Sequence, residues 1–392
     1  MKEEFAVMTH VFIVGSKGIP AQYGGFETFV ENLTAGKQSP EIMYHVSCMN
    51  NDEKHFEHNG ADCFNVRVPL PGAPGRIFHV GLVLAQVEEW AKSHPQVKVI
   101  VCILGCRIGP LLIPHAHKLH KLGAKVYCNP DGLEWKRSKW SAPAKMFLRY
   151  CEKCLVENSD LAICDSVNIE KYIKDTYGER VKDTTFIAYG AYTDRSQCSE
   201  EKLQEWYQQF NIKRGSYYLI VGRFVPENNY ETMITEFMRS KTAKDLVIIT
   251  NVEHNKFYEQ LREKTAFEED SRIKFVGTVY DQDLLKKIRE EAYGYLHGHE
   301  VGGTNPSLLE ALASTKLNLL LGVGFNKEVG EDSALYWNKE SGNLAALLEN
   351  TDALDADTIA LLDKKSTERV MDAYSWEKII NEYESTFIGE VE

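Results

Sequence analysis

Residues 10–28 of the chain read HVFIVGSKGIPAQYGGFET. The apolar run at 11–14 predicts a buried strand and residues 27–36 predict a helix, so a glycine-rich loop joins the two. Glycines let the backbone approach a ligand closely, and a helix N-terminus presents free N–H groups to an anion. The stretch therefore predicts the start of a Rossmann-like domain with a ligand-binding loop.

This loop has neither the G-x-G-x-x-G spacing of dinucleotide-binding domains nor the GK[ST] of a Walker loop. It does contain Lys17, whose positive charge suits a phosphate. The alternative is a long turn in which Glu27 only stabilises the first turn of the following helix.

Short apolar runs alternate with helical patterns along the rest of the first half. Further strands are expected at 44–48, 63–68, 97–104, 125–128 and 161–164. The pattern restarts at residue 217 with YYLIVG and predicts strands at 245–250, 273–276, 293–297 and 317–321. Such alternation predicts an α/β protein with two Rossmann-like, doubly wound parallel-sheet domains. Because open parallel sheets bind ligands at the carboxyl ends of their strands, two such domains are expected to face a central cleft.

The bulk composition fits this interpretation. A chain of 392 residues with 43% hydrophobic content is long enough for two cores. The formal net charge of -12 argues against general nucleic-acid binding. The start, MKEEF, does not resemble a secretory signal, and the apolar stretch 97–114 contains Lys98, Arg107 and Pro110. We therefore expect a cytoplasmic protein.

Two segments after predicted strands of the second half carry polar chemistry. Residues 222–229 read GRFVPENN, and an arginine can hold phosphate oxygens through two parallel N–H donors. The alternative is that Arg223 is a surface ion-pair partner. Residues 296–311 read LHGHEVGGTNPSLLEA, in which Pro306 favours a helix start and the amides of 304–308 could bind a diphosphate. Glu310 lies one turn inside that helix and could accept hydrogen bonds from a sugar hydroxyl.

Several acidic residues are candidates for acid/base groups or metal ligands. Asp131 follows the strand 125–128 and is the first choice for an acid/base or acceptor-orienting carboxylate; Asp165, after 161–164, is the second. Either could instead cap a loop. Two DxD pairs, at 281–283 and 355–357, each lie at or in a helical pattern, so capping explains them better than metal binding. No metal site is predicted.

Residues 115–149 contain eight Lys or Arg and only two acidic residues, against the overall charge. Aromatic residues are interleaved with them. Basic residues with exposed aromatics suit an anionic membrane surface, where each basic residue contributes roughly 1 kcal/mol. The alternative is a solvated helix face. The segment predicts peripheral association with a membrane.

These segments together resemble the retaining GT-B glycosyltransferases of family 4 over nearly the whole chain. The GR…PE…N pattern, SLLEALA at 307–313 and YSWEK at 374–378 correspond to its phosphate stretch, its glutamate motif and its final helix. A closer resemblance is to bacterial rhamnosyltransferases of capsule and cell-wall polysaccharide assembly. It is carried by VFIVGSKGIPAQYGGFETFVENL, NPDGLEWKRSKW, IAYGA, VGRFVPENNYETM and HGHEVGGTNPSLLEALA.

The resemblance implies a GT-B fold with an acceptor-binding domain at 1–195, a nucleotide-sugar domain at 196–370 and a helix at 371–392 that returns to the first domain. It implies transfer of L-rhamnose from dTDP-rhamnose to a sugar on undecaprenyl diphosphate, with retention and without a metal, at the inner face of the cell membrane. The expected catalytic residues are Asp131, Asp165, Arg223 and Lys17. The expected donor-binding residues are Gly15, Gly18, Gly24, Gly25, Arg223, Asn228, Val279, Tyr280, Gly303, Thr304, Asn305, Ser307, Leu308 and Glu310. The expected acceptor-binding residues are Tyr23, Glu27 and Trp135.

Two positions depart from the family pattern. The family usually has a lysine where this chain has Asn228, and a glutamate where it has Gly302, with Glu300 nearby but out of register. Arg223 and Lys17 are therefore expected to supply more of the positive charge at the phosphates. Three alternatives stay open: a transferase that uses another nucleotide sugar, a sugar-nucleotide epimerase of similar architecture, and a non-catalytic nucleotide-sugar-binding protein.

Overall fold

The computed structural model describes residues 8–22, 24–68, 70, 72–252 and 255–389. The chain forms two compact units, unit 1 with residues 1–190 and 376–392 and unit 2 with residues 191–375. The chain enters and leaves unit 2 at neighbouring positions, because the Ala191 N–H donates to the Tyr374 carbonyl at 2.8 Å. The boundaries inferred from the sequence, after 195 and after 370, lie a few residues from these two points.

Unit 1 contains a sheet of eight strands in the order β3-β4-β2-β1-β5-β6-β7-β8, parallel except for β3. The strands are β1 (Thr9–Val14), β2 (Ile42–Met49), β3 (His55–His58), β4 (Ala61–Val66), β5 (Lys98–Leu104), β6 (Lys125–Asn129), β7 (Leu161–Cys164) and β8 (Thr184–Phe186). All six strands expected in this half form. The short edge strands β3 and β8 were not predicted, since neither has a long apolar run.

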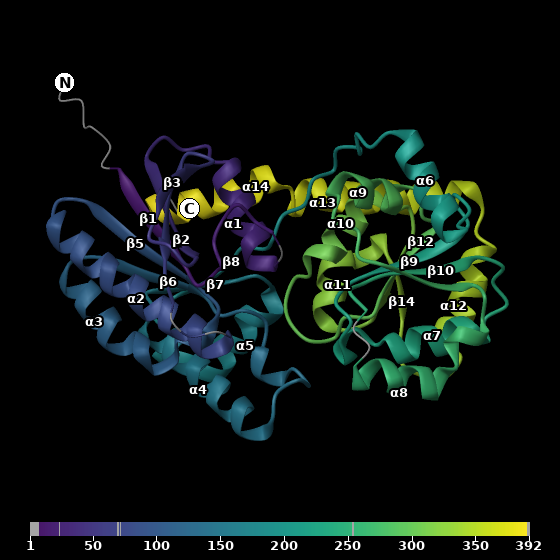
Figure 1. Ribbon diagram of the computed structural model, residues 1–392, viewed down its shortest axis with the longest axis horizontal. Helices are drawn as coiled ribbons and strands as arrows, with labels where there is room; N and C mark the ends of the chain where they lie inside the picture. The colour runs from purple at the N-terminus through teal and green to yellow at the C-terminus, as the bar shows by residue number, and fades with distance from the viewer. Residues whose placement is uncertain (1–7, 23, 69, 71, 253–254, 390–392) are drawn as a thin grey trace. The chain divides into compact units, whose positions relative to one another are not determined.

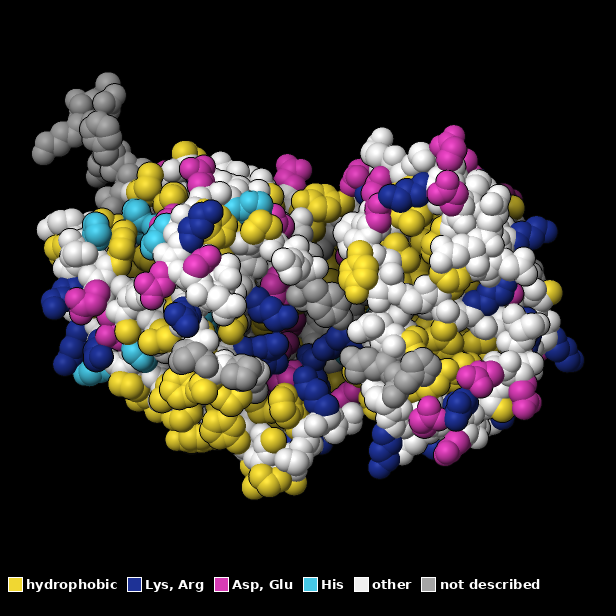
Figure 2. Space-filling model, in the orientation of Figure 1, with side chains coloured by type: hydrophobic (Ala, Val, Ile, Leu, Met, Phe, Trp, Pro, Cys, Tyr) yellow, Lys and Arg dark blue, Asp and Glu magenta, His cyan; other side chains and the backbone are white. Residues whose placement is uncertain are grey.

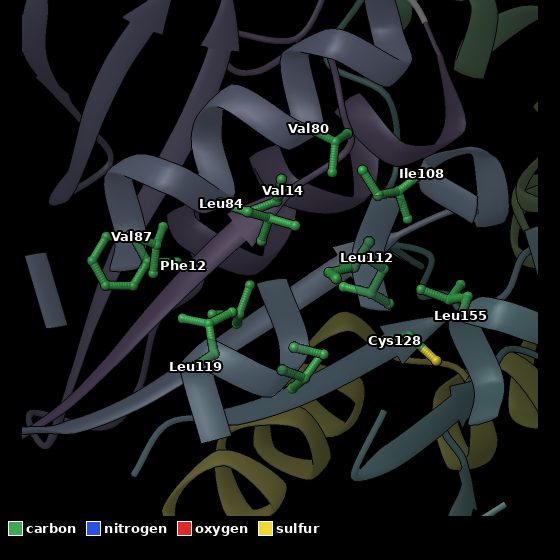
Figure 3. Close-up of a cluster of buried hydrophobic side chains, with 14 of the residues drawn as sticks. Phe12, Val14, Val80, Leu84, Val87, Ile108, Leu112, Leu119, Cys128 and Leu155 are labelled. Atoms are coloured by element: carbon green, nitrogen blue, oxygen red, sulfur yellow. The ribbon is translucent and has the colours of Figure 1, made fainter. Parts of the chain in front are cut away.

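Helices cover both faces of this sheet (Figure 1). They are α1 (Gly25–Ala35), α2 (Gly72–Ser93), η1 (Cys106–Leu111), α3 (Leu112–Lys121), η2 (Glu134–Lys136), α4 (Ala142–Asn158), α5 (Val167–Tyr177), η3 (Gly178–Arg180) and α14 (Trp376–Ile388). Phe12 and Val14 point to the face where α2, α3 and α4 contribute Leu84, Leu112 and Leu155 (Figure 3). The helices α1 and α14 pack against each other, and α14 also contacts β1 and β2. A sheet covered on both faces needs continuous apolar strands, which is why these strands read as apolar runs.

Unit 2 contains six parallel strands in the order β11-β10-β9-β12-β13-β14. The strands are β9 (Tyr217–Val221), β10 (Asp245–Ile249), β11 (Ile273–Gly277), β12 (Gly294–His297), β13 (Asn318–Leu321) and β14 (Leu335–Trp337). The helices are α6 (Glu200–Phe210), η4 (Pro226–Asn228), α7 (Tyr230–Arg239), α8 (Lys256–Thr265), η5 (Phe267–Glu269), α9 (Gln282–Glu290), α10 (Pro306–Ser314), α11 (Gly324–Gly330), η6 (Glu331–Ser333), α12 (Asn343–Asp352) and α13 (Ala356–Ala373). Successive residues of β9 enter two different cores, one on each face of the sheet.

Each sheet has one topological switch point. In unit 1 the strand β1 lies between β2 and β5, and in unit 2 the strand β9 lies between β10 and β12. In each unit the chain first adds strands on one side of its first strand and then crosses back to add strands on the other side. Ligands of open α/β sheets bind in the crevice that this reversal opens at the carboxyl ends of the two strands. Within the described residues, no helix has the length and apolar character needed to cross a bilayer.

Candidate functional site

The loop after β1 is held by two glutamates of α1. The Lys17 N–H donates to Glu27 Oε1 at 2.8 Å, and the Ala21 N–H donates to Glu31 Oε2 at 2.8 Å. Gly18 has φ of 101°, and a Cβ there would lie 2.6 Å from the Cα of Cys48. The loop therefore folds back on the sheet in one conformation, which a longer side chain at position 18 would prevent.

These contacts distinguish loop residues that hold the loop in place from loop residues that stay open to a ligand. Glu27 is 9% exposed, and its carboxylate is turned into the loop. The structure therefore gives Glu27, which was expected to bind an acceptor, a role in holding the loop. Gly24 has φ of 134° and lies directly against that carboxylate, whereas Gly25 opens α1 with free space beside it. Lys17 is exposed and forms no ion pair in the part of the chain that the structure describes. Tyr23 lies outside the described residues.

A crevice opens at the switch point of unit 1, between the carboxyl ends of β1 and β5. Its glycines, Gly15 and Gly105, have φ of 106° and 84°, and a Cβ on Gly15 would lie 2.3 Å from the Leu104 carbonyl oxygen. Its accessible volume of about 30 Å³ is enough for a water molecule or the tip of a polar group. The lining residues are Gly15, Phe26, Arg76, Val80, Leu104, Gly105, Cys106, Arg107, Ile108, Asp131 and Glu134.

Three charged residues of this crevice were not singled out in the sequence, namely Arg76, Arg107 and Glu134. Arg107 follows β5 within three residues, so the rule that chemistry follows each strand could have identified it. Arg76 lies on α2, four residues before Val80 on the same helix face, and nothing in its local sequence marks it.

Glu134 is almost fully buried and is surrounded by cations. Its Oε2 lies 2.7 Å from Arg137 Nε, and its Oε1 lies 2.9 Å from Lys139 Nζ and 3.4 Å from Arg107 Nη2. The indole N–H of Trp140 donates to the same Oε1 at 3.1 Å. Burial acts to raise the pKa of Glu134, but the charges of Arg137, Lys139 and Arg107 outweigh burial and hold the pKa below its ordinary value. Glu134 is thus a permanent anion and no proton acceptor at neutral pH.

Of the two candidate carboxylates, only Asp131 lines the crevice. It has φ of 64°, its Oδ1 accepts from the Gly132 N–H at 2.8 Å, and its side chain is 24% exposed. Asp165 follows β7 and is 4% exposed, so its carboxylate is covered by protein. Trp135, expected to bind an acceptor, lies beside Lys136 and Arg149, whose cationic groups are 5.4 Å and 5.2 Å from its ring, and it does not line the crevice.

In unit 2, three hydrogen bonds join the loop after β9 to the loop after β12. Asn228 Oδ1 lies 2.8 Å from His299 Nδ1, and the Asn229 side chain donates to the Gly298 carbonyl at 2.7 Å. The Glu300 N–H donates to the Glu227 carbonyl at 3.1 Å. Asn228 also donates to the Arg223 carbonyl at 2.7 Å. The two segments that the sequence singled out separately therefore form one connected surface at the switch point of unit 2.

The Arg223 side chain projects from this surface. It is exposed, and no ion pair to it occurs among the described residues. Its guanidinium donors are available to a ligand, which disfavours the alternative of a surface ion-pair partner. Glu300, in contrast, forms an ion pair with Lys339.

The start of α10 is capped by its own loop. Asn305 Oδ1 accepts from the Ser307 N–H at 2.9 Å, and the Asn305 carbonyl accepts from the Leu308 N–H at 3.0 Å. The Ser307 hydroxyl donates to the Val221 carbonyl at 3.1 Å, which ties α10 to the end of β9. Since Pro306 has no N–H and the N–H groups of Ser307 and Leu308 are bonded to Asn305, these three positions of the predicted 304–308 amide cradle offer no free donor.

Glu310 is held by a buried arginine. Arg289 Nη2 lies 2.5 Å from Glu310 Oε2, and the exposed fractions of the two side chains are 5% and 39%. The carboxylate is therefore fixed but still reachable from solvent. Val279 and Tyr280 follow β11, which β10 separates from β9, and Tyr280 is 75% exposed. Val279 packs against the core that contains Leu219 of β9, whereas the Tyr280 side chain lies in solvent.

Within the described chain, no cluster of three or more His, Cys, Asp or Glu side chains is arranged to hold a metal ion. Asp281 caps α9 and Asp355 caps α13, as the capping interpretation of the two DxD pairs predicts. His297 is 5% exposed, and its pKa is lowered to about 3 by burial and by neighbouring His299.

Comparisons with known proteins place the fold. A family model described as a domain of unknown function, DUF1972, matches residues 8–192. No curated protein matches the chain by sequence. Among solved structures, sucrose-phosphate synthase from Thermosynechococcus elongatus has a TM-score of 0.76 at 15% identity, over 98% of this chain and 99% of that one.

Two further structures agree with it. HepE from Anabaena in complex with UDP has a TM-score of 0.72 at 12% identity, over 98% of this chain and 100% of that one. A glycosyltransferase from Rickettsia africae has a TM-score of 0.72 at 13% identity, over 99% and 100% of the two chains. With its two parallel-sheet units, the chain has the two-domain, Rossmann-like GT-B fold that the sequence predicted.

Proposed function

We propose that the protein is a glycosyltransferase whose unit 2 binds a nucleoside-diphosphate sugar. The observation that carries this proposal is the surface at the switch point of unit 2. There the exposed Arg223, which has no ion-pair partner among the described residues, projects from loops that Asn228 and Asn229 hold together. Glu310, anchored by Arg289, adds a fixed acceptor for hydroxyl groups. The structural neighbour HepE, solved in complex with UDP, supports a nucleotide ligand for this fold.

The chemistry of sugar transfer matches these groups. Breaking a glycosyl-phosphate bond builds negative charge on the departing diphosphate, and preorganised donors that stabilise this charge lower the barrier. The guanidinium of Arg223 offers two parallel N–H donors to phosphate oxygens. The assignment of Lys17 to the same leaving group stays a prediction. No metal is expected, since a guanidinium and backbone amides can stabilise the leaving group without one.

Unit 1 is proposed to bind the acceptor. Asp131 is the one candidate carboxylate that lines its crevice, and it can orient the attacking hydroxyl through a hydrogen bond. With retention of configuration, as the family resemblance implies, no enzyme nucleophile is required. Asp165 is proposed to act as a structural residue instead, because it is buried.

The substrates follow from the resemblance to rhamnosyltransferases. We propose dTDP-rhamnose as donor and a hexose or N-acetylhexosamine on undecaprenyl diphosphate as acceptor. The alternatives are another nucleotide-sugar donor and a sugar-nucleotide epimerase.

A lipid-linked acceptor makes a membrane-facing surface useful, and one side of unit 1 suits it. Met146, Phe147 and Tyr150 of α4 are 70%, 48% and 49% exposed. Lys145 and Arg149 alternate with them, so apolar and basic groups share one helix face. Figure 2 shows hydrophobic side chains gathered over the side of unit 1 that α2 and α4 form. These features support peripheral binding at the cytoplasmic face of the membrane, centred on residues 115–149.

The decisive test is a donor panel with a synthetic lipid-diphosphate sugar acceptor, read by mass and run with and without EDTA. We expect transfer of rhamnose from dTDP-rhamnose, unchanged by EDTA. Transfer from another donor alone would select the first alternative. A changed sugar in the absence of acceptor would select the epimerase. No change of any donor would contradict the enzyme proposal.

Membrane binding is tested by sedimentation with vesicles. We expect the chain to bind vesicles that contain phosphatidylglycerol and not those of phosphatidylcholine alone. The double substitution Met146→Ser and Phe147→Ser should abolish that binding, whereas the same change at Met371, an exposed methionine of α13, should not. Equal binding by both variants would contradict the assigned surface.

A further inference from the structure

The crevice of unit 1 carries more positive charge than its own carboxylates neutralise. Arg76, Arg107, Arg137 and Lys139 line it or contact its wall, against Asp131 and Glu134. Glu134 alone already has two cations within 3 Å. An excess of cations at a partly closed site is unfavourable unless solvent or an anionic ligand compensates it.

Arg107 is positioned but not saturated. The structure shows one contact to its guanidinium, at 3.4 Å from Glu134 Oε1, and its side chain is 33% exposed. A guanidinium has five N–H donors, so most of those on Arg107 are left for another group. Arg76 is half-buried, and none of the ion pairs found in the described residues includes it. Both arginines line the same crevice, so both can donate to an anion that enters it.

The shape of the crevice limits what can enter. Gly15 and Gly105 line it, and Gly15 packs directly against the Leu104 carbonyl oxygen. Phe26 lies against Gly105, with its ring 3.3 Å from where a Cβ would be. Val80 and Ile108 complete an apolar wall. Because the crevice admits only the tip of a polar group, phosphate oxygens can reach the arginines while the attached ring stays at its mouth.

We propose that Arg76 and Arg107 bind the phosphate that is attached directly to the acceptor sugar, and that Glu134 is a positioning residue for Arg107. This inference rests on the proposed function, and it names the residues that recognise the phosphate of the proposed lipid-diphosphate acceptor. A sugar held by its phosphate at the arginines presents its ring towards Asp131, which lines the same crevice. The same phosphate chemistry also occurs in the donor, so the experiment separates the two sources.

The test uses the full chain and isothermal titration with inorganic pyrophosphate, in the presence of saturating dTDP to occupy the donor site. We expect pyrophosphate to bind the wild-type chain. Arg76→Gln and Arg107→Gln should each weaken this binding by about tenfold or more, because a charge-assisted hydrogen bond contributes that much. Their affinity for dTDP should stay within twofold of wild type. Lys121→Gln is the matched control. This exposed lysine at the end of α3 precedes β6 and so lies at the amino ends of the strands, whereas the crevice lies at their carboxyl ends.

A kinetic experiment tests the assignment of the crevice to the acceptor. With an active donor, the wild type should prefer a lipid-diphosphate sugar over the neutral alkyl glycoside of the same sugar, through KM, and Arg107→Gln should remove the preference. Arg107→Lys should restore only part of it, because lysine keeps the charge but not the fork. Glu134→Gln should raise the KM for the lipid-diphosphate sugar and leave that for the glycoside unchanged.

Each other outcome overturns the inference. Weaker dTDP binding in the arginine variants would assign the crevice to the donor. Unchanged pyrophosphate binding in both variants would show that the crevice holds no phosphate. If no donor gives transfer, pyrophosphate titration still decides the crevice, so failure of the proposed function and failure of this inference are distinguishable.

Discussion

Asn228 Oδ1 lies 2.8 Å from His299 Nδ1, and this contact joins the loop that presents Arg223 to the loop that leads into α10. The two residues are 71 positions apart in the chain. Both polar atoms of the Asn228 side chain are bonded, because its NH₂ group also donates to the Arg223 carbonyl. The backbone at Arg223 is thus held by a side chain that the sequence predicted to bind the donor.

Asn228→Ala is expected to weaken dTDP and UDP binding by about tenfold, because Arg223 loses the anchor of its carbonyl and the two loops lose one connection. Isothermal titration measures the change. The stability of unit 2 should fall by about 1 kcal/mol at most, as for one partly buried hydrogen-bonding side chain. Full nucleotide affinity in this variant would show that the contact does not position Arg223.

Arg223→Gln is expected to lower kcat/KM for transfer by about 10²- to 10³-fold, because it removes a charged donor from the leaving diphosphate. Steady-state kinetics with the donor identified in the panel measures the loss. Lys213→Gln removes an exposed positive charge from the same unit and should change kcat/KM by less than about twofold. Equal effects of the two substitutions would show that Arg223 contributes only its charge and makes no specific contact with the diphosphate.

Asp131→Asn is expected to lower kcat by about 10²-fold or more while nucleotide affinity stays unchanged, because the amide cannot accept the proton of the attacking hydroxyl. Asp165→Asn should instead lower the free energy of unfolding, since that carboxylate is 4% exposed. Kinetics together with urea unfolding separates the two effects. A reversed pattern would exchange the roles assigned to the two residues.

Gly18→Ala is expected to destabilise unit 1 by about 3 kcal/mol, because the new Cβ meets Cys48 at 2.4–2.6 Å and the backbone has φ of 101°. Gly123→Ala is the matched control: its φ is 81°, but nothing lies within 4 Å, so only backbone strain of about 1 kcal/mol applies. Urea unfolding followed by tryptophan fluorescence gives both values. Equal losses would show that the contact with Cys48 relaxes easily.

Acidification is expected to destabilise unit 2 through His297. Its pKa is about 3 in the folded chain against 6.5 when unfolded, so the unfolded state takes up the proton first and stability falls as the pH drops below 6.5. Between pH 7 and pH 5 the loss amounts to about 2 kcal/mol. His297→Gln should remove that part of the pH dependence in urea unfolding. An unchanged pH dependence would mean that His297 titrates normally.

The fold could be predicted from the sequence because the pattern that marks each strand and helix is local. A parallel strand covered on both faces is a run of apolar residues, as at β1, β5 and β9, and each such run is followed by a helical period. The predicted strands therefore appear where expected. The edge strands β3, β8 and β14 were not predicted, because an edge strand needs few apolar residues and its pairing is set by the neighbouring strand.

The candidate site was only partly accessible. Arg223 and Glu310 lie in motifs next to strand ends, and the structure leaves both open to solvent. Glu27 shows the limit: its place in a glycine-rich loop suggests a ligand, whereas its contacts show a carboxylate that accepts the Lys17 N–H. A hydrogen bond across ten residues depends on how the loop folds back, which no local pattern encodes.

By itself the sequence determined the order of the main strands and helices and their division into two domains. It also placed glycines and arginines at the strand ends. These features could be predicted because periodicity and backbone freedom act over a few neighbouring residues. Only the tertiary structure decided that Arg76, Arg107 and Glu134 meet in one crevice, that Asp131 joins them, and that Asn228 supports Arg223. These residues come from separate segments, and the pairing of parallel strands brings their ends to one edge of a sheet. That pairing is a property of the assembled core rather than of any single segment.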